Sequence, residues 1–139
     1  MTPPRPASVR PKAAWRVGLG GRARRQGRAA EWIAAALLMA RGYQIIGFRL
    51  KNPMGEIDLL ARRGAVLAVV EVKRRATLDQ ALTCLTGAQK ARLMAAGRAV
   101  MRNRPSLKHL SLRLDMVALA PGRFPRHVRG LSLETPRRT

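Results

Sequence analysis

The chain has 139 residues, with 28 Lys and Arg against 7 Asp and Glu, so its formal net charge is +21. This length fits one domain with its own core, and no apolar stretch approaches the ~20 residues that cross a bilayer. A single cysteine, Cys84, excludes an internal disulfide framework and favours a reducing, cytoplasmic location. The first residues carry charge but no apolar segment, so we expect no secretory signal.

The surplus of positive charge repels itself, and a polyanion would relieve that repulsion. Nucleic acid is the commonest such partner, and release of its counterions would drive binding. A merely solubilising basic surface is the alternative that composition leaves open. A membrane partner is not expected, because no basic amphipathic helix carries aromatic anchors.

The first third of the chain divides into an arm and a helix. Residues 1–21 are basic and proline-rich, which predicts a disordered arm. Apolar residues at helical spacing predict a helix over Arg22–Arg41, which Gly42 ends, and we place Trp32 of this helix in the core. Three strands are predicted next, at Gln44–Leu50, Glu56–Ala61 and Ala65–Lys73.

The rest of the chain predicts a helix and one or two strands. A nearly continuous apolar run, Val66–Val70, suits a central strand that is buried on both faces. Residues 76–85 are ambiguous, a helix follows at Thr86–Arg104, and a strand is expected at Leu110–Ala120. A short edge strand and a flexible tail over 131–139 complete the chain. The order predicts an α/β domain over residues 22–130, in which a mixed sheet of four to five strands is flanked by helices.

The scarce carboxylates are informative because several fall in predicted strands, among them Asp58, Glu71 and Asp115. A carboxylate within apolar strand sequence costs several kcal/mol unless something pairs with it. A hairpin that bends at Gly64 would place Asp58 opposite residues 68–70, near Glu71. Alternation along a strand puts Lys73 on the same face as Glu71.

Two neighbouring carboxylates repel each other unless a cation bridges them. Mg²⁺ (or Mn²⁺) fits, because it is a hard ion that prefers carboxylate and carbonyl oxygens. We therefore predict a metal site formed by Asp58, Glu71 and the backbone carbonyl of Val72. Such an ion would polarise a phosphodiester and lower the pKa of an attacking water, which Lys73 would orient. Glu31 on the first helix could hold a metal-bound water or a second ion.

Each of these residues also has a plain structural interpretation. Asp58 could pair with Arg62 or Arg49, Glu71 and Lys73 could form a surface ion pair, and Glu31 could favour the helix dipole. The two histidines, His109 and His127, lie in basic polar segments without ligand spacing, so we expect both at the surface.

Four motifs carry a family resemblance. The segments Gly27-Arg-Ala-Ala-Glu31, Gly55-Glu-Ile-Asp58, Val70-Glu71-Val-Lys73 and Leu114-Asp115-Met-Val resemble the YraN-type family of restriction-endonuclease-like proteins. The match runs from about Gly27 to about Gly130, and it does not include the basic arm.

The resemblance implies the PD-(D/E)xK nuclease core, similar to that of archaeal-type Holliday junction resolvases. It assigns Asp58, Glu71 and Lys73 to the catalytic motif and Glu31 to a supporting helix position. Ile57 stands where the motif has its nominal Pro, a residue that contributes no chemistry.

Three functions remain open at this point. The first is a metal-dependent endonuclease that hydrolyses phosphodiesters in DNA, with branched DNA among its substrates. The second is a non-catalytic nucleic-acid-binding protein that keeps the nuclease fold, and the third is a small basic protein associated with RNA or the ribosome. The carboxylates argue against the second, because binding alone would dispense with anions near phosphate. Cutting both strands of a symmetric junction would favour a homodimer.

Overall fold

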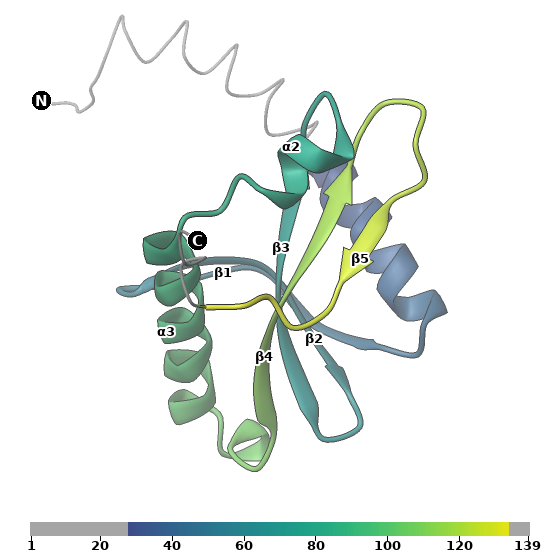
Figure 1. Cartoon of the computed structure of the whole chain (residues 1–139). Coiled ribbons are helices and arrows are strands. Elements are labelled where there is room, and N and C mark those ends of the chain that lie inside the picture. Colours follow the sequence, from purple (N-terminus) through teal and green to yellow (C-terminus); the bar gives the residue numbers. More distant parts are fainter. Residues whose placement is uncertain (1–27, 134–139) are drawn as a thin grey trace, which may run out of the picture.

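The computed structural model describes residues 28–133, so the predicted arm at 1–21 and most of the predicted tail lie outside the described residues. A five-stranded mixed sheet runs through the middle of the domain, with helices on both of its faces (Figure 1). The predicted α/β fold is confirmed, and its layout is consistent with a restriction-endonuclease-like core. No helix within residues 28–133 is long and apolar enough to cross a membrane.

The sheet has the order β1-β2-β3-β4-β5. Strands β1 (Gln44–Asn52), β2 (Gly55–Arg63) and β3 (Val66–Arg74) form an antiparallel meander. Strand β4 (Ser111–Leu119) lies parallel to β3, and the short β5 (Arg126–Val128) pairs antiparallel with β4 at the edge. The apolar run of β3 therefore occupies the centre of the sheet, as its composition predicts.

The first helix spans residues 28–40 in the described part of the chain, and the chain turns at Gly42 with a φ of 89°, as a helix stop requires. The prediction that Trp32 lies in the core is wrong, because this residue is 62% exposed. The helix instead buries smaller residues on the neighbouring stripe, including Ala34 and Leu38. Apolar residues occupy both faces of this helix, so periodicity alone did not indicate which face packs on the sheet.

The second half of the chain supplies the other helical layer. The ambiguous segment holds the short helix α2 (Leu78–Leu82). Helix α3 (Gly87–Asn103) begins with a reciprocal pair of hydrogen bonds between Thr86 and Gln89, which satisfies two free backbone donors. A 3₁₀ turn, η1 (Pro105–Leu107), follows α3 and leads into β4.

The core lies on both faces of the sheet. One cluster packs the first helix against β2, β3 and β4 through residues such as Leu38, Leu59 and Val70. The other packs α3 against the opposite face through residues such as Leu93 and Val69. The backbone N–H of Leu131 donates to the carbonyl of Leu114 at 2.7 Å, so the first residue of the predicted tail is bonded to the sheet.

Gly97 marks the closest approach of α3 to the sheet. A Cβ atom at this position would lie 2.6 Å from Cγ2 of Val69 and 3.1 Å from the Leu112 side chain. Gly97→Ala should therefore lower the free energy of unfolding by about 1–2 kcal/mol, because overpacking outweighs the ~1 kcal/mol gained in helix propensity. Urea unfolding followed by circular dichroism measures this loss. The same change should cost less in a Val69→Ala background, and equal costs in both backgrounds would contradict the steric explanation.

Candidate functional site

The site begins where the β2–β3 ladder ends. The paired positions run from Arg63 with Val66, at the turn, to Leu59 with Val70. The next step along the same register aligns Asp58 with Glu71, one residue beyond the predicted positions 68–70. Residues that face each other across an antiparallel pair project from the same side of the sheet. The hairpin therefore directs both carboxylates to one place at its open end.

The Asp58 carboxyl group is half-buried and lies in contact with that of Glu71. The backbone N–H of Val72 donates to Asp58 Oδ2 at 2.9 Å. Burial, followed by hydrogen bonding to and repulsion from Glu71, raises the pKa of Asp58 from 3.8 to about 7, although the Val72 N–H and the charge of Lys73 oppose the rise. Near neutral pH the Asp58 carboxyl group is therefore protonated for much of the time.

Lys73 lies beside the carboxylates. Its Nζ atom is 3.3 Å from Glu71 Oε2, and the Lys73 side chain remains 27% exposed whereas that of Glu71 is only 11% exposed. The structure thus places Glu71 and Lys73 on one face, as alternation along β3 predicts. An ammonium group that is both paired and open to solvent can contact an approaching anion without leaving its carboxylate partner.

Arg49 links Glu31 to this site. Its Nε atom donates to Glu31 Oε1 at 2.8 Å. That hydrogen bond, together with weaker attraction to Glu56 and Asp58, raises the pKa of the Arg49 guanidinium although burial opposes the rise. Glu31 is buried to 8% exposure and is held by Arg49, and no hydrogen bond or ion pair within residues 28–133 joins Glu31 to Asp58 or Glu71.

The backbone at Arg49 is strained. Its φ of 52° is the one positive value at a non-glycine residue among residues 28–133. Phe48 packs with the first helix, whereas Leu50, two residues later, packs with α3. Strand β1 therefore changes faces at Arg49, where alternation would keep these two side chains on the same face. Arg49 was expected only as an alternative partner of Asp58, and its role at the change of faces was not predicted.

The donor set at the site consists of hard oxygen atoms. Within residues 28–133, no cluster of three or more His, Cys, Asp or Glu side chains is arranged to hold a metal. Asp58 and Glu71 thus offer two carboxylates rather than a full cage. The N–H of Val72 points toward Asp58, and the N–H and C=O of one residue leave an extended strand on the same side, so its carbonyl is directed toward the same gap.

Asp115 belongs to a separate polar cluster. Its fully buried carboxylate accepts two 2.7 Å hydrogen bonds from Arg113, one of 2.8 Å from His127 Nε2 and one of 3.0 Å from the Gly130 N–H. Burial alone would raise the pKa of Asp115, but the hydrogen bonds from His127, Arg113 and Gly130 outweigh it and lower the pKa to about 2. The expectation that His127 lies at the surface is wrong, because its side chain is 1% exposed and fastens β5 to β4.

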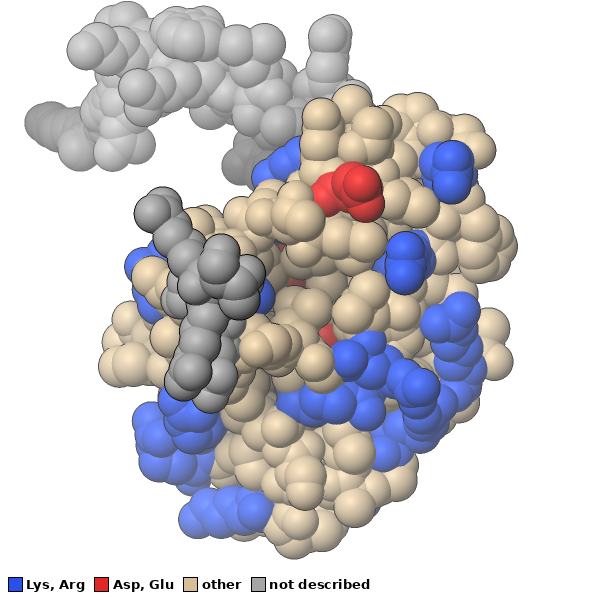
Figure 2. All heavy atoms as spheres, in the orientation of Figure 1, with Lys and Arg blue, Asp and Glu red and all other residues tan. Residues whose placement is uncertain are grey.

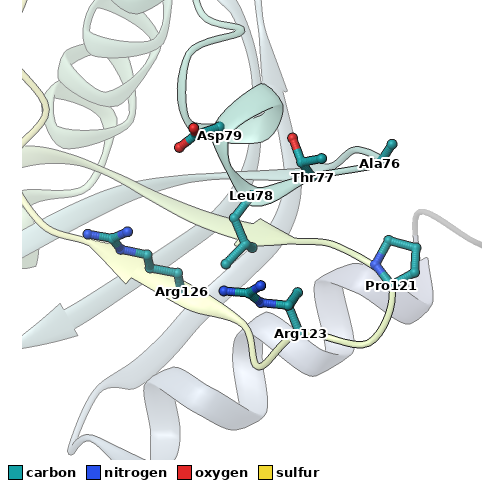
Figure 3. Close-up of a pocket in the computed structure, with 7 residues that line it drawn as sticks. All are labelled: Ala76, Thr77, Leu78, Asp79, Pro121, Arg123 and Arg126. Atoms are coloured by element: carbon teal, nitrogen blue, oxygen red, sulfur yellow. The ribbon is translucent and has the colours of Figure 1, made fainter.

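Basic side chains lie along one side of a hollow that contains recessed acids. Figure 2 shows small areas of red within this hollow, with Lys and Arg side chains mainly below it and to its right. A cavity of about 520 Å³ lies just beyond the ends of β3 and β4, and it contains none of the predicted site residues. Leu78 points toward Arg123 across this cavity (Figure 3). Its lining comprises Ala76, Thr77, Leu78, Asp79, Pro121, Arg123 and Arg126.

The fold and the site together define a basic α/β protein with paired carboxylates and a lysine at the open end of a β-hairpin. Residues 30–119 match the model of the "Uncharacterised protein family UPF0102". The chain belongs to this family, which is the YraN-type family indicated by its motifs.

Several relatives match most of the chain. A "UPF0102 protein" of Caulobacter sp. (strain K31) is 52% identical over 126 residues, covering 88% of this chain and 91% of the relative. One from Chelativorans sp. (strain BNC1) is 44% identical over 110 residues, covering 79% and 89%. "UPF0102 protein BRADO0179" of Bradyrhizobium sp. (strain ORS 278) is 42% identical over 126 residues, covering 91% and 83%.

The raised pKa of Asp58 predicts how stability depends on pH. The folded protein holds this proton more tightly than the unfolded chain, so the free energy of unfolding falls as the pH rises from about 4 to about 7. Asp58→Asn removes that penalty and should be more stable than the wild type by up to about 4 kcal/mol at pH 8, with little difference at pH 4. Urea unfolding at both pH values measures the effect.

Glu56→Gln is the matched control, because Glu56 is an exposed acid on the same strand whose ion-pair partner is Lys51 at 3.6 Å. Its effect should be small and similar at both pH values. An Asp58→Asn variant that gained no stability between pH 4 and pH 8 would contradict the proposed carboxylate pairing.

Proposed function

We propose that this protein is a metal-dependent endonuclease of the PD-(D/E)xK kind, which hydrolyses phosphodiester bonds in DNA. The observation that carries the proposal is the meeting of Asp58, Glu71 and Lys73 at the open end of the β2–β3 hairpin. Ion pairs that serve stability alone do not require two carboxylates in contact, since this contact is unfavourable without a cation or a shared proton.

The residues present fit a magnesium or manganese ion. Burial is the largest cause of the raised pKa of Asp58, and hydrogen bonding to Glu71 and repulsion from it add to the rise. A divalent cation between the two carboxylates would convert that repulsion into attraction. Asp58, Glu71 and the Val72 carbonyl would hold the ion, and Mg²⁺ ordinarily keeps several waters, so two carboxylates suffice. When bound, the ion would supply Lewis acidity toward a phosphodiester oxygen and a water of lowered pKa.

The remaining side chains have distinct roles in this proposal. Lys73, held by Glu71 but partly exposed, would orient the attacking water or stabilise negative charge that grows on the phosphoryl oxygens. Arg49 would hold Asp58 in place from the opposite strand. Glu31 would act through Arg49, which its carboxylate fixes at 2.8 Å, as a positioning residue.

Charge supports nucleic acid as the substrate. The net charge of +21 favours a polyanion, and Arg123 and Arg126 line a cavity that begins three residues beyond Lys73. We favour DNA over RNA, with branched DNA among the substrates, on the family resemblance. A cytoplasmic location and a homodimer that cuts two strands belong to the same proposal.

The nearest competing function is a nucleic-acid-binding protein that keeps the fold without catalysis. The absence of a three-carboxylate cluster within residues 28–133 favours this alternative. The pairing of Asp58 with Glu71 opposes it, because anions beside a phosphate weaken binding unless they perform another task.

Cleavage assays test the proposal. The purified protein should cut linear, single-stranded or four-way-junction DNA when Mg²⁺ or Mn²⁺ is present. Asp58→Asn, Glu71→Gln and Lys73→Met should each reduce the cleavage rate by at least ~100-fold, because each removes a charge that acts in the transition state. Gel analysis of labelled strands gives the rate, and equal rates in all variants would assign the cleavage to a contaminant.

Glu56→Gln and Lys51→Met serve as controls, since they remove the same charges from an exposed pair in the same hairpin. Their cleavage rates should stay within about twofold of the wild type. A second measurement does not depend on activity: Mg²⁺ at pH 8 should raise the Tm of the wild type but not that of Asp58→Asn. Tight DNA binding with neither cleavage nor a metal-dependent Tm would favour the binding protein instead.

DNA affinity should depend steeply on salt, because each phosphate contact releases a counterion. Arg123→Gln should weaken binding to any DNA sequence and reduce the slope of log affinity against log salt by about 1. Fluorescence anisotropy from 50 to 300 mM KCl measures this slope. Arg92→Gln on α3, an exposed arginine outside the cavity, provides the comparison, and a slope that Arg123→Gln leaves unchanged would remove this cavity from the DNA-binding surface.

A further inference from the structure

A second polar cavity lies on another part of the molecule. It has a volume of about 320 Å³ and lies where the end of the first helix, the β2–β3 turn and the edge strand β5 meet. Its lining consists of Arg41, Tyr43, Arg63, His127 and Arg129. No residue of the Asp58–Glu71 site contributes to this lining.

The cavity gathers positive charge that no acid neutralises. Within residues 28–133, no ion pair joins Arg41, Arg63 or Arg129 to a carboxylate. The neighbouring Arg113 differs, because Asp115 binds its guanidinium through two hydrogen bonds. Three guanidinium groups around one hollow repel one another, and an anion in the hollow would relieve that repulsion.

The position of Arg63 is defined by two contacts. Its guanidinium lies over the Tyr43 ring at 4.6 Å from the centroid, and its Nη1 atom donates to the Arg41 carbonyl at 3.1 Å. These contacts use one face of the guanidinium and one of its five N–H groups. The remaining N–H groups are available to an anion, and a planar guanidinium matches two oxygens of a phosphate.

Two further side chains on the wall, Tyr43 and His127, have unused hydrogen-bonding capacity. His127 uses Nε2 for Asp115, and its buried Nδ1 atom has no hydrogen-bond partner within residues 28–133. The Tyr43 hydroxyl accepts from Arg113 at 2.5 Å and keeps its own hydrogen to donate. Buried polar atoms are rarely left unpaired. Because Nε2 donates to the Asp115 carboxylate, Nδ1 can donate to a phosphate oxygen in the imidazolium form of His127, or accept from a protonated phosphate oxygen in the neutral form.

We propose that this cavity is a phosphate-binding site, separate from the Asp58–Glu71 site. Its ligand is a phosphate group held by Arg41, Arg63 and Arg129. Arg63 lies five residues along β2 from Asp58, which corresponds to roughly 17 Å at ~3.3 Å per residue. Either a backbone phosphate of a polynucleotide or a free phosphate offers the required chemistry.

Calorimetric titration of the full chain with inorganic phosphate, at constant ionic strength, tests the site. The wild type should bind phosphate, and Arg63→Gln and Arg129→Gln should each weaken this binding at least tenfold. Arg98→Gln is the matched control, because Arg98 is an exposed arginine of α3 outside this cavity, and it should change the affinity less than twofold. Glu71→Gln should also bind phosphate like the wild type, which separates this test from that of the proposed nuclease activity.

A DNA arm distinguishes the two sources of phosphate. If the ligand is a backbone phosphate, inorganic phosphate should compete with a labelled duplex on the wild type but not on Arg63→Gln, which should itself bind the duplex more weakly. If the ligand is a free phosphate, duplex affinity should be equal in the two proteins. Absence of phosphate binding by the wild type, or equal losses in Arg63→Gln, Arg129→Gln and Arg98→Gln, would overturn the proposal.

Discussion

The contact between the Asp58 and Glu71 carboxyl groups is the interaction on which the functional argument depends. The β2–β3 register aligns the two residues, and burial and mutual repulsion together raise the pKa of Asp58 to about 7. An apolar residue in place of either acid would be more favourable for stability, and the neighbouring positions Leu59 and Val70 are indeed apolar. Locally unfavourable arrangements that the surrounding structure maintains are typical of functional sites.

The strained backbone of Arg49 supports the same place from the neighbouring strand. A left-handed conformation at a residue with a long side chain costs of order 1–3 kcal/mol. Here it lets β1 change faces between Phe48, which packs with the first helix, and Leu50, which packs with α3. Glu31 then fixes the guanidinium from the helix. The first helix thus contributes to the site through an arginine, which explains why a buried acid stands on its inner face.

Features that depend on neighbouring residues in the sequence were predicted correctly, whereas features that depend on distant segments were not. Three predictions rested on patterns of a few residues: the apolar run of β3, the glycine stop after the first helix, and the alternation of Glu71 with Lys73. These patterns predicted the central strand of the sheet, the end of the helix and the common face of the two charged side chains. Trp32 and His127 were misplaced because their surroundings come from distant segments. Phe48 shields one side of the Trp32 ring, and Asp115, twelve residues before His127, draws that imidazole into the interior. The distortion at Arg49 had no local signature, because arginine has no preference for positive φ.

The distribution of charge explains how a protein with an acidic site can still attract a polyanion. Glu31, Glu71 and Asp115 are buried, and each is bonded to a basic side chain. Each pair is nearly neutral from a distance, so these three acids do little to oppose the surplus of positive charge on the protein. The field of a charge pair falls off faster with distance than the field of a single charge. The unpaired basic side chains therefore attract a distant nucleic acid, and the paired acids affect it only when it contacts the site. The few carboxylates of this chain can thus perform local chemistry without opposing the long-range attraction that brings the substrate to them.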